Sequence, residues 1–317
     1  MKKRFFIAFY IFWISILIYI FIRLIQPPVS ENSNSLALSN QPSIRWVEPK
    51  SRICFLKLPE GCFYMGSSRL EINRSNDEGP LHRVCLDSFW ISEHEITVRQ
   101  FHEFVRQTDY QTQAEQDGFS WAYDGEWKKR SGLSWKNPGF SQTQNHPVVH
   151  VTYDDALKMA KWLSDINRHF LLPNETQWEY ACRAQSNSSR FFGEDISQTC
   201  TFANVADQTI KKKYHAWRVH PCNDSFTFTA PAGMFSPNQF GLYDMLGNVW
   251  EWCINAYVYD AYLNPKQLLR VHNDQTAVSI RGGSWYTCPQ YLRCANRDFV
   301  AYCKRRSSDL GFRLIMK

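Results

Sequence analysis

The sequence predicts an α+β domain with much irregular structure, preceded by a membrane-spanning helix. Three capping-box patterns each begin a helix-period run of apolar residues. Elsewhere the chain consists of short apolar runs interrupted by Gly, Pro and Asn, so helices and strands do not alternate as in a parallel α/β sheet. The glycine-rich nucleotide motifs and the hydrolase nucleophile motif are absent from the sequence.

Composition and charge narrow the class of protein. The 317 residues are 44% hydrophobic and 21% charged, which suits one large globular domain and excludes a disordered or fibrous chain. Residues 2–4 and Arg23 carry four of the six net positive charges, leaving about +2 for the rest, too little for a nucleic-acid partner. The basic runs at residues 128–130, 211–213 and 304–306 are therefore expected to be solvated surface.

The N-terminus predicts where the protein resides. Residues 5–22 carry no charge, a run that is just long enough to span a bilayer and longer than a signal-peptide core. The basic residues 2–4 favour a cytoplasmic N-terminus, so residues 1–4 are expected in the cytoplasm and 5–25 as a transmembrane signal anchor. A cleavage site after Ala37 would lie far beyond the apolar run. The remaining chain is expected outside the cytoplasm, in a periplasm or secretory lumen.

A tether and a single domain are expected after the anchor. Residues 26–50 are rich in Pro, Ser, Asn and Gln, and such a stretch buries too little apolar surface to offset its loss of conformational entropy. Residues 51–317 contain no second linker and no internal repeat. We therefore expect a disordered tether followed by one folded unit.

The cysteines support an extracytoplasmic domain. All ten lie beyond the anchor, and their even number in an oxidising compartment predicts several disulfides, whose pairing spacing alone leaves open. No two cysteines are arranged as C-x-x-C, and the nine histidines show no zinc-ligand spacing. The cysteines are Cys54, Cys62, Cys85, Cys182, Cys200, Cys222, Cys253, Cys288, Cys294 and Cys303.

Three helix starts are predicted from side chains that cap the first turn. In each, a Thr or Asn is followed three residues later by a Gln or Asp, and apolar residues then recur on one helical face. The pairs are Thr97 with Gln100, Thr152 with Asp155, and Asn174 with Gln177.

A series of motifs runs in order through residues 53–315. The most specific are LPNETQWEY at residues 172–180, FGLYDMLGNVWEW at residues 240–252 and RGGSW at residues 281–285. Others are DEGPLHRV at 77–84, PVVHVTYDDA at 147–156, and GFR at 311–313. Together they resemble the formylglycine-generating, or sulfatase-modifying factor, family. The resemblance implies an irregular α+β domain related to C-type lectins.

The resemblance also implies a departure at the family's copper centre. The family oxidase converts a substrate cysteine to formylglycine with copper held by two cysteines, and soft thiolates suit Cu(I). In that enzyme the first cysteine stands three positions after the G-G-S serine, whereas Cys288 stands four positions after Ser284. Cys294 matches a structural cysteine, and no thiol occupies the second copper position. The chain is thus similar to a divergent member lacking the copper pair, with Cys288 and Ser284 as its catalytic candidates.

Two functions follow from this resemblance. The first is a membrane-anchored extracytoplasmic binding or maturation module that recognises a protein or peptide partner. Trp250 and Ser284 match cleft-lining positions and would contact the peptide, although a core aromatic and a turn residue are equally consistent. The alternative is an active formylglycine-generating oxidase that acts on sulfatases. Whether the protein is an enzyme is left open by the sequence.

Two calcium sites and one disulfide are further implications of the resemblance. Carboxylate, amide and carbonyl oxygens are the ligands that Ca²⁺ prefers. The first matching set is Asn204, Val205, Asp224 and Phe226, and the second is Asp244, Gly247, Val249 and Glu251. Family members with cysteines matching Cys182 and Cys294 link them. The partners of a second family bridge are replaced here by Lys161 and Leu314.

Overall fold

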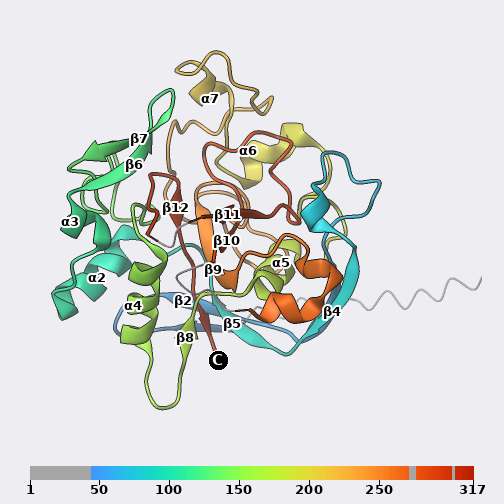
Figure 1. Ribbon diagram of the computed structural model, residues 1–317, viewed down its shortest axis with the longest axis horizontal. Coiled ribbons are helices and arrows are strands. Elements are labelled where there is room, and N and C mark those ends of the chain that lie inside the picture. The colour runs from blue at the N-terminus through green and yellow to red at the C-terminus, as the bar shows by residue number, and fades with distance from the viewer. Residues whose placement is uncertain (1–43, 271–275, 302–303) are drawn as a thin grey trace, which may run out of the picture. The chain divides into compact units, whose positions relative to one another are not determined.

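The computed structural model describes residues 44–270, 276–301 and 304–317 (Figure 1). Within these ranges no helix is long and apolar enough to cross a membrane. The membrane helix expected over residues 5–25 lies outside the described residues, as does most of the expected tether.

All three helices predicted from capping boxes are present. They are α2 Val98–Thr108, α4 Tyr153–Leu163 and α5 Glu175–Arg183. In each, the side chain at the N-cap accepts a hydrogen bond from the N–H of the third helical residue, and the side chain of that residue accepts one from the N-cap N–H. The other helical segments are short: α3 Gln113–Asp117, α6 Thr199–Phe202, α7 Gln208–Lys211, and the 3-10 turns η1 Asn76–Glu78, η2 Ile196–Gln198, η3 Ala261–Leu263 and η4 Pro265–Leu269.

The largest sheet joins the two ends of the domain. Its order is β1-β2-β5-β13-β8, and every neighbouring pair is antiparallel. Its first strand, Arg45–Val47, lies inside the segment 26–50 that was expected to be a disordered tether, so the sheet begins earlier than expected. Trp46 explains this, because its ring packs on Phe55 and Phe170. The strands are β1 Arg45–Val47, β2 Cys54–Leu58, β5 Phe89–Ser92, β13 Ile315–Met316 and β8 Phe170–Leu171.

A second, four-stranded sheet lies between the two main clusters of the hydrophobic core. Its order is β11-β10-β9-β12, in which β12 runs parallel to β9 and the other pairs are antiparallel. In Figure 1, α2 and α4 lie on one side of β9 and β10, and α5 lies on the other. Two hairpins, β3–β4 and β6–β7, stand apart from both sheets. The bounds are β9 Trp250–Ala256, β10 Val278–Arg281, β11 Asp298–Val300, β12 Leu310–Gly311, β3 Gly61–Met65, β4 His82–Leu86, β6 Phe119–Tyr123 and β7 Trp127–Ser131.

The core forms on both sides of the second sheet. One cluster includes Phe101 of α2, Met159 of α4 and Trp252 of β9, and the other is centred on Trp178 of α5. Residues 184–249, between α5 and β9, contain only short helices and loops, so this part of the chain is as irregular as the sequence predicted. The α+β fold class is therefore confirmed.

Two disulfides constrain the irregular parts of the fold. Cys62 and Cys85 face each other across the β3–β4 hairpin, and Cys200 of α6 is joined to Cys222. Disulfides persist in oxidising compartments, so these bonds indicate that the domain is extracytoplasmic.

Candidate functional site

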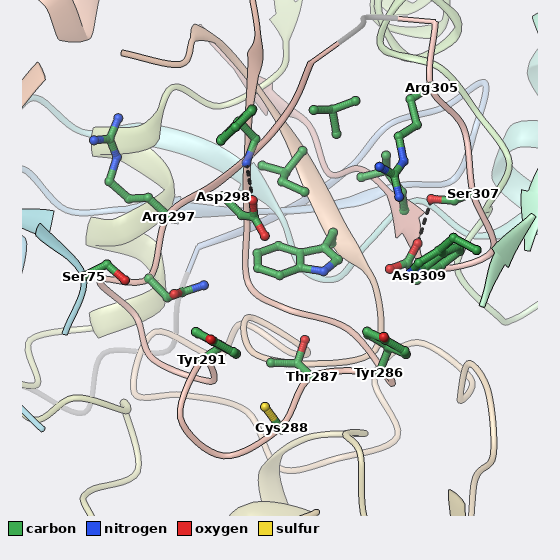
Figure 2. Close-up of a pocket in the computed structure, with 17 residues that line it drawn as sticks. Ser75, Tyr286, Thr287, Cys288, Tyr291, Arg297, Asp298, Arg305, Ser307 and Asp309 are labelled. Carbon is green, nitrogen blue, oxygen red and sulfur yellow. Dashed lines mark hydrogen bonds between the residues drawn. The ribbon is translucent and has the colours of Figure 1, made fainter. Parts of the chain in front are cut away.

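A pocket of about 610 Å³ lies beside the second sheet, lined by residues from several distant segments. Figure 2 shows Tyr286, Thr287, Cys288 and Tyr291, from the loop after β10, on one side of it. Asp298, Arg305 and Asp309, from the C-terminal part of the chain, lie on the other. Trp250, the first residue of β9, is 9% exposed and lines the pocket with its indole ring. The pocket therefore combines aromatic rings, one thiol and a few charged groups.

The double glycine of the RGGSW motif shapes one wall of the pocket. Gly282 and Gly283 have φ values of +99° and +79°, which residues with side chains rarely adopt. A Cβ on Gly283 would lie 2.9 Å from Oγ1 of Thr287, the atom that accepts a hydrogen bond from the N–H of Ser284 at 2.8 Å. The tight turn that results brings Thr287 and Cys288 to the pocket.

The predicted site residues are only partly brought together. Trp250 and Cys288 line the same pocket, although 38 positions separate them in the chain. Ser284 is fully buried beneath the wall, where its Oγ accepts a hydrogen bond from the N–H of Tyr286 at 3.3 Å, and it does not line the pocket. Cys294 is buried elsewhere, with its Sγ 2.6 Å from that of Cys182.

The environment of Cys288 does not favour copper. Burial raises the pKa of the Cys288 thiol, which disfavours the thiolate that a nucleophile or a Cu(I) ligand requires. Among the pocket-lining residues that the structure describes, Cys288 is the only cysteine. Cys303 lies outside the described residues. The part of the pocket that is described therefore does not fit a copper ion held by two thiolates.

The charged groups of the pocket were not predicted from the sequence. Ser307 Oγ donates a hydrogen bond to Asp309 Oδ1 at 2.7 Å, and burial raises the pKa of the Asp309 carboxyl. The guanidinium of Arg305 acts in the opposite direction and lowers that pKa. Burial also raises the pKa of Tyr286, to about 12, so its hydroxyl remains a neutral donor at ordinary pH. These side chains supply the polar contacts of an otherwise aromatic cavity.

The first set of expected calcium ligands is gathered in the irregular segment. Asp224 accepts hydrogen bonds from the N–H groups of Val205 and Phe226, each at 2.8 Å. Burial, together with nearby Asp207, which sequence reasoning missed, raises the pKa of Asp224 to about 7. The Oδ1 atom of Asn204 is buried with no hydrogen-bond partner among the described residues. This buried amide oxygen is therefore unoccupied by any described donor and is available to a cation.

One wider acidic cluster contains the same aspartate. Ligand atoms of Cys200, Asp207 and Asp224 lie within 4.8 Å of one another, but Cys200 is bonded to Cys222 and offers no thiolate. The ligand atoms that remain are therefore oxygens, and their chemistry fits Ca²⁺ better than a soft metal.

In the second set of expected calcium ligands, Asp244 has an oxygen without a hydrogen-bond partner among the described residues, whereas the charge of Glu251 is neutralised by Arg313. Asp244 Oδ2 accepts a hydrogen bond from Gly233 N–H at 2.6 Å, whereas its Oδ1 is buried without a hydrogen-bond partner in the described structure. Both oxygens of Glu251 are bonded to Arg313, at 2.7 to 2.9 Å, and one also accepts a bond from Trp178 Nε1. Asp244 thus fits a calcium ligand more directly than Glu251 does.

Glu95 is the residue that sequence reasoning missed at this site. It is fully buried between β5 and α2, and neither of its carboxylate oxygens has a hydrogen-bond partner in the described ranges. Burial raises the pKa of Glu95 well above its ordinary value, and the charges of Asp244 and Glu251 raise it further. A buried carboxylate without partners is costly unless a proton or a cation neutralises it. Its only sequence signal is a carboxylate beside apolar Ile96.

The two candidate calcium sites are in contact. Gly247 has φ of +84°, and a Cβ at this position would lie 2.3 Å from the carbonyl oxygen of Asn204. The N–H of Asn248 donates to that same oxygen at 2.8 Å. Glycine is therefore required where the loop of the second site crosses the first.

Calcium is expected to stabilise the protein through Glu95 and Asp244. A ligand that binds only the native state at a hundredfold excess over Kd adds about 2.7 kcal/mol, or roughly 5–10 °C in Tm for a domain of this size. Glu95→Gln combined with Asp244→Asn should remove one bound ion in calorimetric titration of the full-length chain and reduce the increment in Tm.

The matched control for calcium is Asp155→Asn. Asp155 is equally buried but accepts hydrogen bonds from Thr152 N–H and the Tyr110 hydroxyl, so this variant should keep the full calcium response while losing stability. An unchanged ion count in the Glu95/Asp244 double variant would remove both residues from the ligand set.

The chain is similar to known proteins over most of its length. Residues 48–317 match the family described as "Sulfatase-modifying factor enzyme 1-like domain". The chain is 31% identical over 275 residues to "Formylglycine-generating enzyme" of Thermomonospora curvata, covering 77% of this chain and 85% of that protein. It is 28% identical over 268 residues to "Inactive C-alpha-formylglycine-generating enzyme 2" of Bos taurus, covering 76% and 80%. The solved structure of PvdO from Pseudomonas aeruginosa is similar, with a TM-score of 0.72 and 26% identity, over 88% of this chain and 100% of that one.

Proposed function

Because the chain belongs to the formylglycine-generating, or sulfatase-modifying factor, family, we propose that it is a binding or maturation module that recognises an extended segment of a partner protein. The segment binds in the pocket that contains Trp250 and Cys288, on a domain held at the membrane by residues 5–25.

The composition of the pocket supports peptide recognition. Peptide-binding clefts present aromatic faces together with a few convergent polar groups. Here the polar groups include Asn296 and Asp309, and the volume of about 610 Å³ accommodates several side chains of an extended chain. The aromatic lining residues are Trp127, Trp250, Tyr286, Tyr291 and Phe299.

One observation favours binding over oxidation of a cysteine. The described pocket offers a single thiol, and burial raises its pKa, so Cys288 is poorly suited to hold copper or to act as a thiolate. The named relatives include both a formylglycine-generating enzyme and an inactive one, so membership of the family is compatible with either function.

Peptide binding is expected to depend on Tyr291, which lines the pocket and is 47% exposed. The probe is a fluorescent peptide of sequence Cys-x-Pro-x-Arg, added to the full-length chain. Replacing Tyr291 with alanine should weaken binding about tenfold, since an aromatic contact of this kind contributes roughly 1–2 kcal/mol. Tyr259, which is 59% exposed and lies outside this pocket, gives the control variant Tyr259→Ala.

The same peptide separates the two functions. It is incubated with the protein, copper and reductant under air, and its mass is then measured. The expected result is an unchanged cysteine, whereas conversion to formylglycine at turnover rates would establish the oxidase and assign Cys288 to it. Equal affinity of the Tyr291 and Tyr259 variants would place peptide binding outside this pocket.

The membrane anchor is tested by fusion. Alkaline phosphatase joined after residue 50 should be active, because residues 5–22 would export everything that follows them. An inactive phosphatase fusion beside an active cytoplasmic reporter at the same position would contradict the proposed topology.

A further inference from the structure

We propose that a basic groove next to the pocket binds an acidic stretch of the partner polypeptide, adjoining the segment held by the pocket. This inference rests on the proposed function and names the charge of the partner. The groove has a volume of about 540 Å³. We define the basic groove by Phe119, Trp121, Trp127, Lys129, Lys304 and Arg305, all of which line it.

Aromatic rings line the groove, and the charged groups of basic side chains lie against them. The β6–β7 hairpin, at the edge of the domain in Figure 1, supplies Phe119 and Trp121 from one strand and Trp127 from the other. Lys129 Nζ lies 4.7 Å from the centre of the Phe119 ring, and the guanidinium of Arg305 lies 5.6 Å from the Trp127 ring. Cation–π contacts of this kind hold a positive charge in place while leaving its hydrogen-bond donors exposed.

The charges of the groove are not balanced within it. Its lining residues include no Asp or Glu among those the structure describes. Arg306, which also lines the groove, is paired with Asp117, but no ion pair is found between described residues for Lys129, Lys304 or Arg305. Three exposed cations thus line one concave surface, and although Arg305 also lowers the pKa of Asp309 in the pocket, a partner with several carboxylates would complement them.

The neighbouring basic residues of the same strand behave differently. Lys128 pairs with Glu126, and Arg130 pairs with Asp124. Side chains alternate along a strand, so these two lie on the face opposite Lys129, and neither lines the groove. The basic runs at 128–130 and 304–306 were expected to be solvated surface. Lys129 of the first run and all three residues of the second instead line one groove.

The groove is continuous with the peptide-binding pocket. Trp127, Val300 and Arg305 line both cavities. An extended polypeptide that leaves the pocket past Trp127 would therefore enter the groove directly. This continuity favours an acidic flank of the same polypeptide over an unrelated anionic partner.

The test compares peptides that differ only in their flanks. The Cys-x-Pro-x-Arg probe is made with four neutral residues, or with four Asp and Glu residues, on its N-terminal or C-terminal side. Binding to the full-length chain is measured at low and at high salt. One acidic flank should tighten binding about tenfold at low ionic strength, and the gain should disappear near ~0.5 M salt because the charges are exposed.

Two charge-reversal variants locate the effect. Lys129→Glu with Lys304→Glu should abolish the gain from the acidic flank. Lys128→Glu with Arg130→Glu changes the charge equally on the opposite face and should keep it.

The outcomes are distinguishable. Equal affinity for neutral and acidic flanks, or equal losses in the two variants, would overturn this inference and leave peptide recognition standing. Absence of binding by every peptide would overturn both. Heparin binding through Lys129 and Lys304, without any gain from an acidic flank, would identify a polysaccharide site and overturn the inference as well.

Discussion

Replacing Arg313 with methionine is expected to lower the free energy of unfolding by about 3–5 kcal/mol in calcium-free buffer. Arg313 is fully buried and holds both carboxylate oxygens of Glu251 through Nε and Nη2. It also donates to the carbonyl oxygens of Ser92 and Tyr243. Methionine fills a similar volume but supplies none of these donors.

The expected loss is large because other buried acids lie nearby. The positive charge of Arg313 lowers the pKa of Glu95 and of Asp244, whereas burial raises both. Without Arg313, these two carboxylates and Glu251 would share a buried region with no cation. Such a cluster must take up protons or remain partly unfolded, and each choice reduces stability.

The measurement is urea-induced unfolding of the full-length chain, with calcium and with a chelator. Arg313→Met combined with Glu251→Gln should be more stable than Arg313→Met alone, because the double variant no longer leaves Glu251 unpaired. Arg106→Met is the control, since Arg106 pairs with Glu103 on an exposed helix face and should change stability little. An equal loss in the Arg106 and Arg313 variants would refute the importance of the buried pair.

The helices could be predicted because their starting signals are local. The capping boxes at Thr97, Thr152 and Asn174 each lie within four residues of chain, so no tertiary information is needed to recognise them. The strand at Arg45–Val47 could not be predicted in this way. Its stability depends on Trp46 reaching Phe55 and Phe170, and the second of these is more than a hundred positions away.

The candidate site was predictable only where a motif marked it. The GNVWEW and RGGSW motifs identified Trp250 and the loop that carries Cys288, and both line the pocket. Ser284 belongs to the same motif, but the turn buries it. Its N–H donates to Thr287 Oγ1, and its hydroxyl oxygen accepts from the N–H of Tyr286. Asp309 and Glu95 lack such a marker, since their roles arise from neighbours distant in the chain.

The pairing of the cysteines could not be predicted either, because it also depends on contacts between distant parts of the chain. Ten cysteines in an extracytoplasmic chain predict bridges, but spacing cannot select among the many possible pairings. Cys62 and Cys85 are paired by the register of the β3–β4 hairpin, in which they stand opposite each other. Cys200 and Cys222 are paired across a loop without strands. Neither register nor loop path can be read from the positions of the cysteines.

Removal of a bond between Cys182 and Cys294 is the second large effect that we expect. Both cysteines are fully buried and stand as free thiols in the structure, with their Sγ atoms 2.6 Å apart, longer than a disulfide bond but closer than ordinary van der Waals contact. Cys182 is near the end of α5, and Cys294 follows Arg293, whose guanidinium is anchored by Glu78. Packing therefore holds both thiols in place, and oxidation requires little movement of either.

Such a bond would close a loop of 112 residues. Chain entropy assigns at most about 5 kcal/mol to a loop of this length, with strain and residual structure in the unfolded chain reducing the gain. Cys182→Ala with Cys294→Ala should therefore lower the free energy of unfolding of protein made in an oxidising compartment, and a reductant should bring the wild type close to the variant.

Cys253→Ala is the matched control, because Cys253 is equally buried and contacts no other sulfur among the described residues, so its replacement removes a thiol and its packing but no possible cross-link. Two free thiols would also pack well in this core, so stability alone does not decide the matter. Peptide mapping without reductant does, because a bridge releases the peptides of Cys182 and Cys294 as one species. If Cys294 were instead recovered alkylated, or joined to a different cysteine, the predicted bridge would be wrong. The 182 and 294 positions would then owe their proximity to the packing of α5 against the loop after β10, and the double alanine variant would be expected to behave like Cys253→Ala.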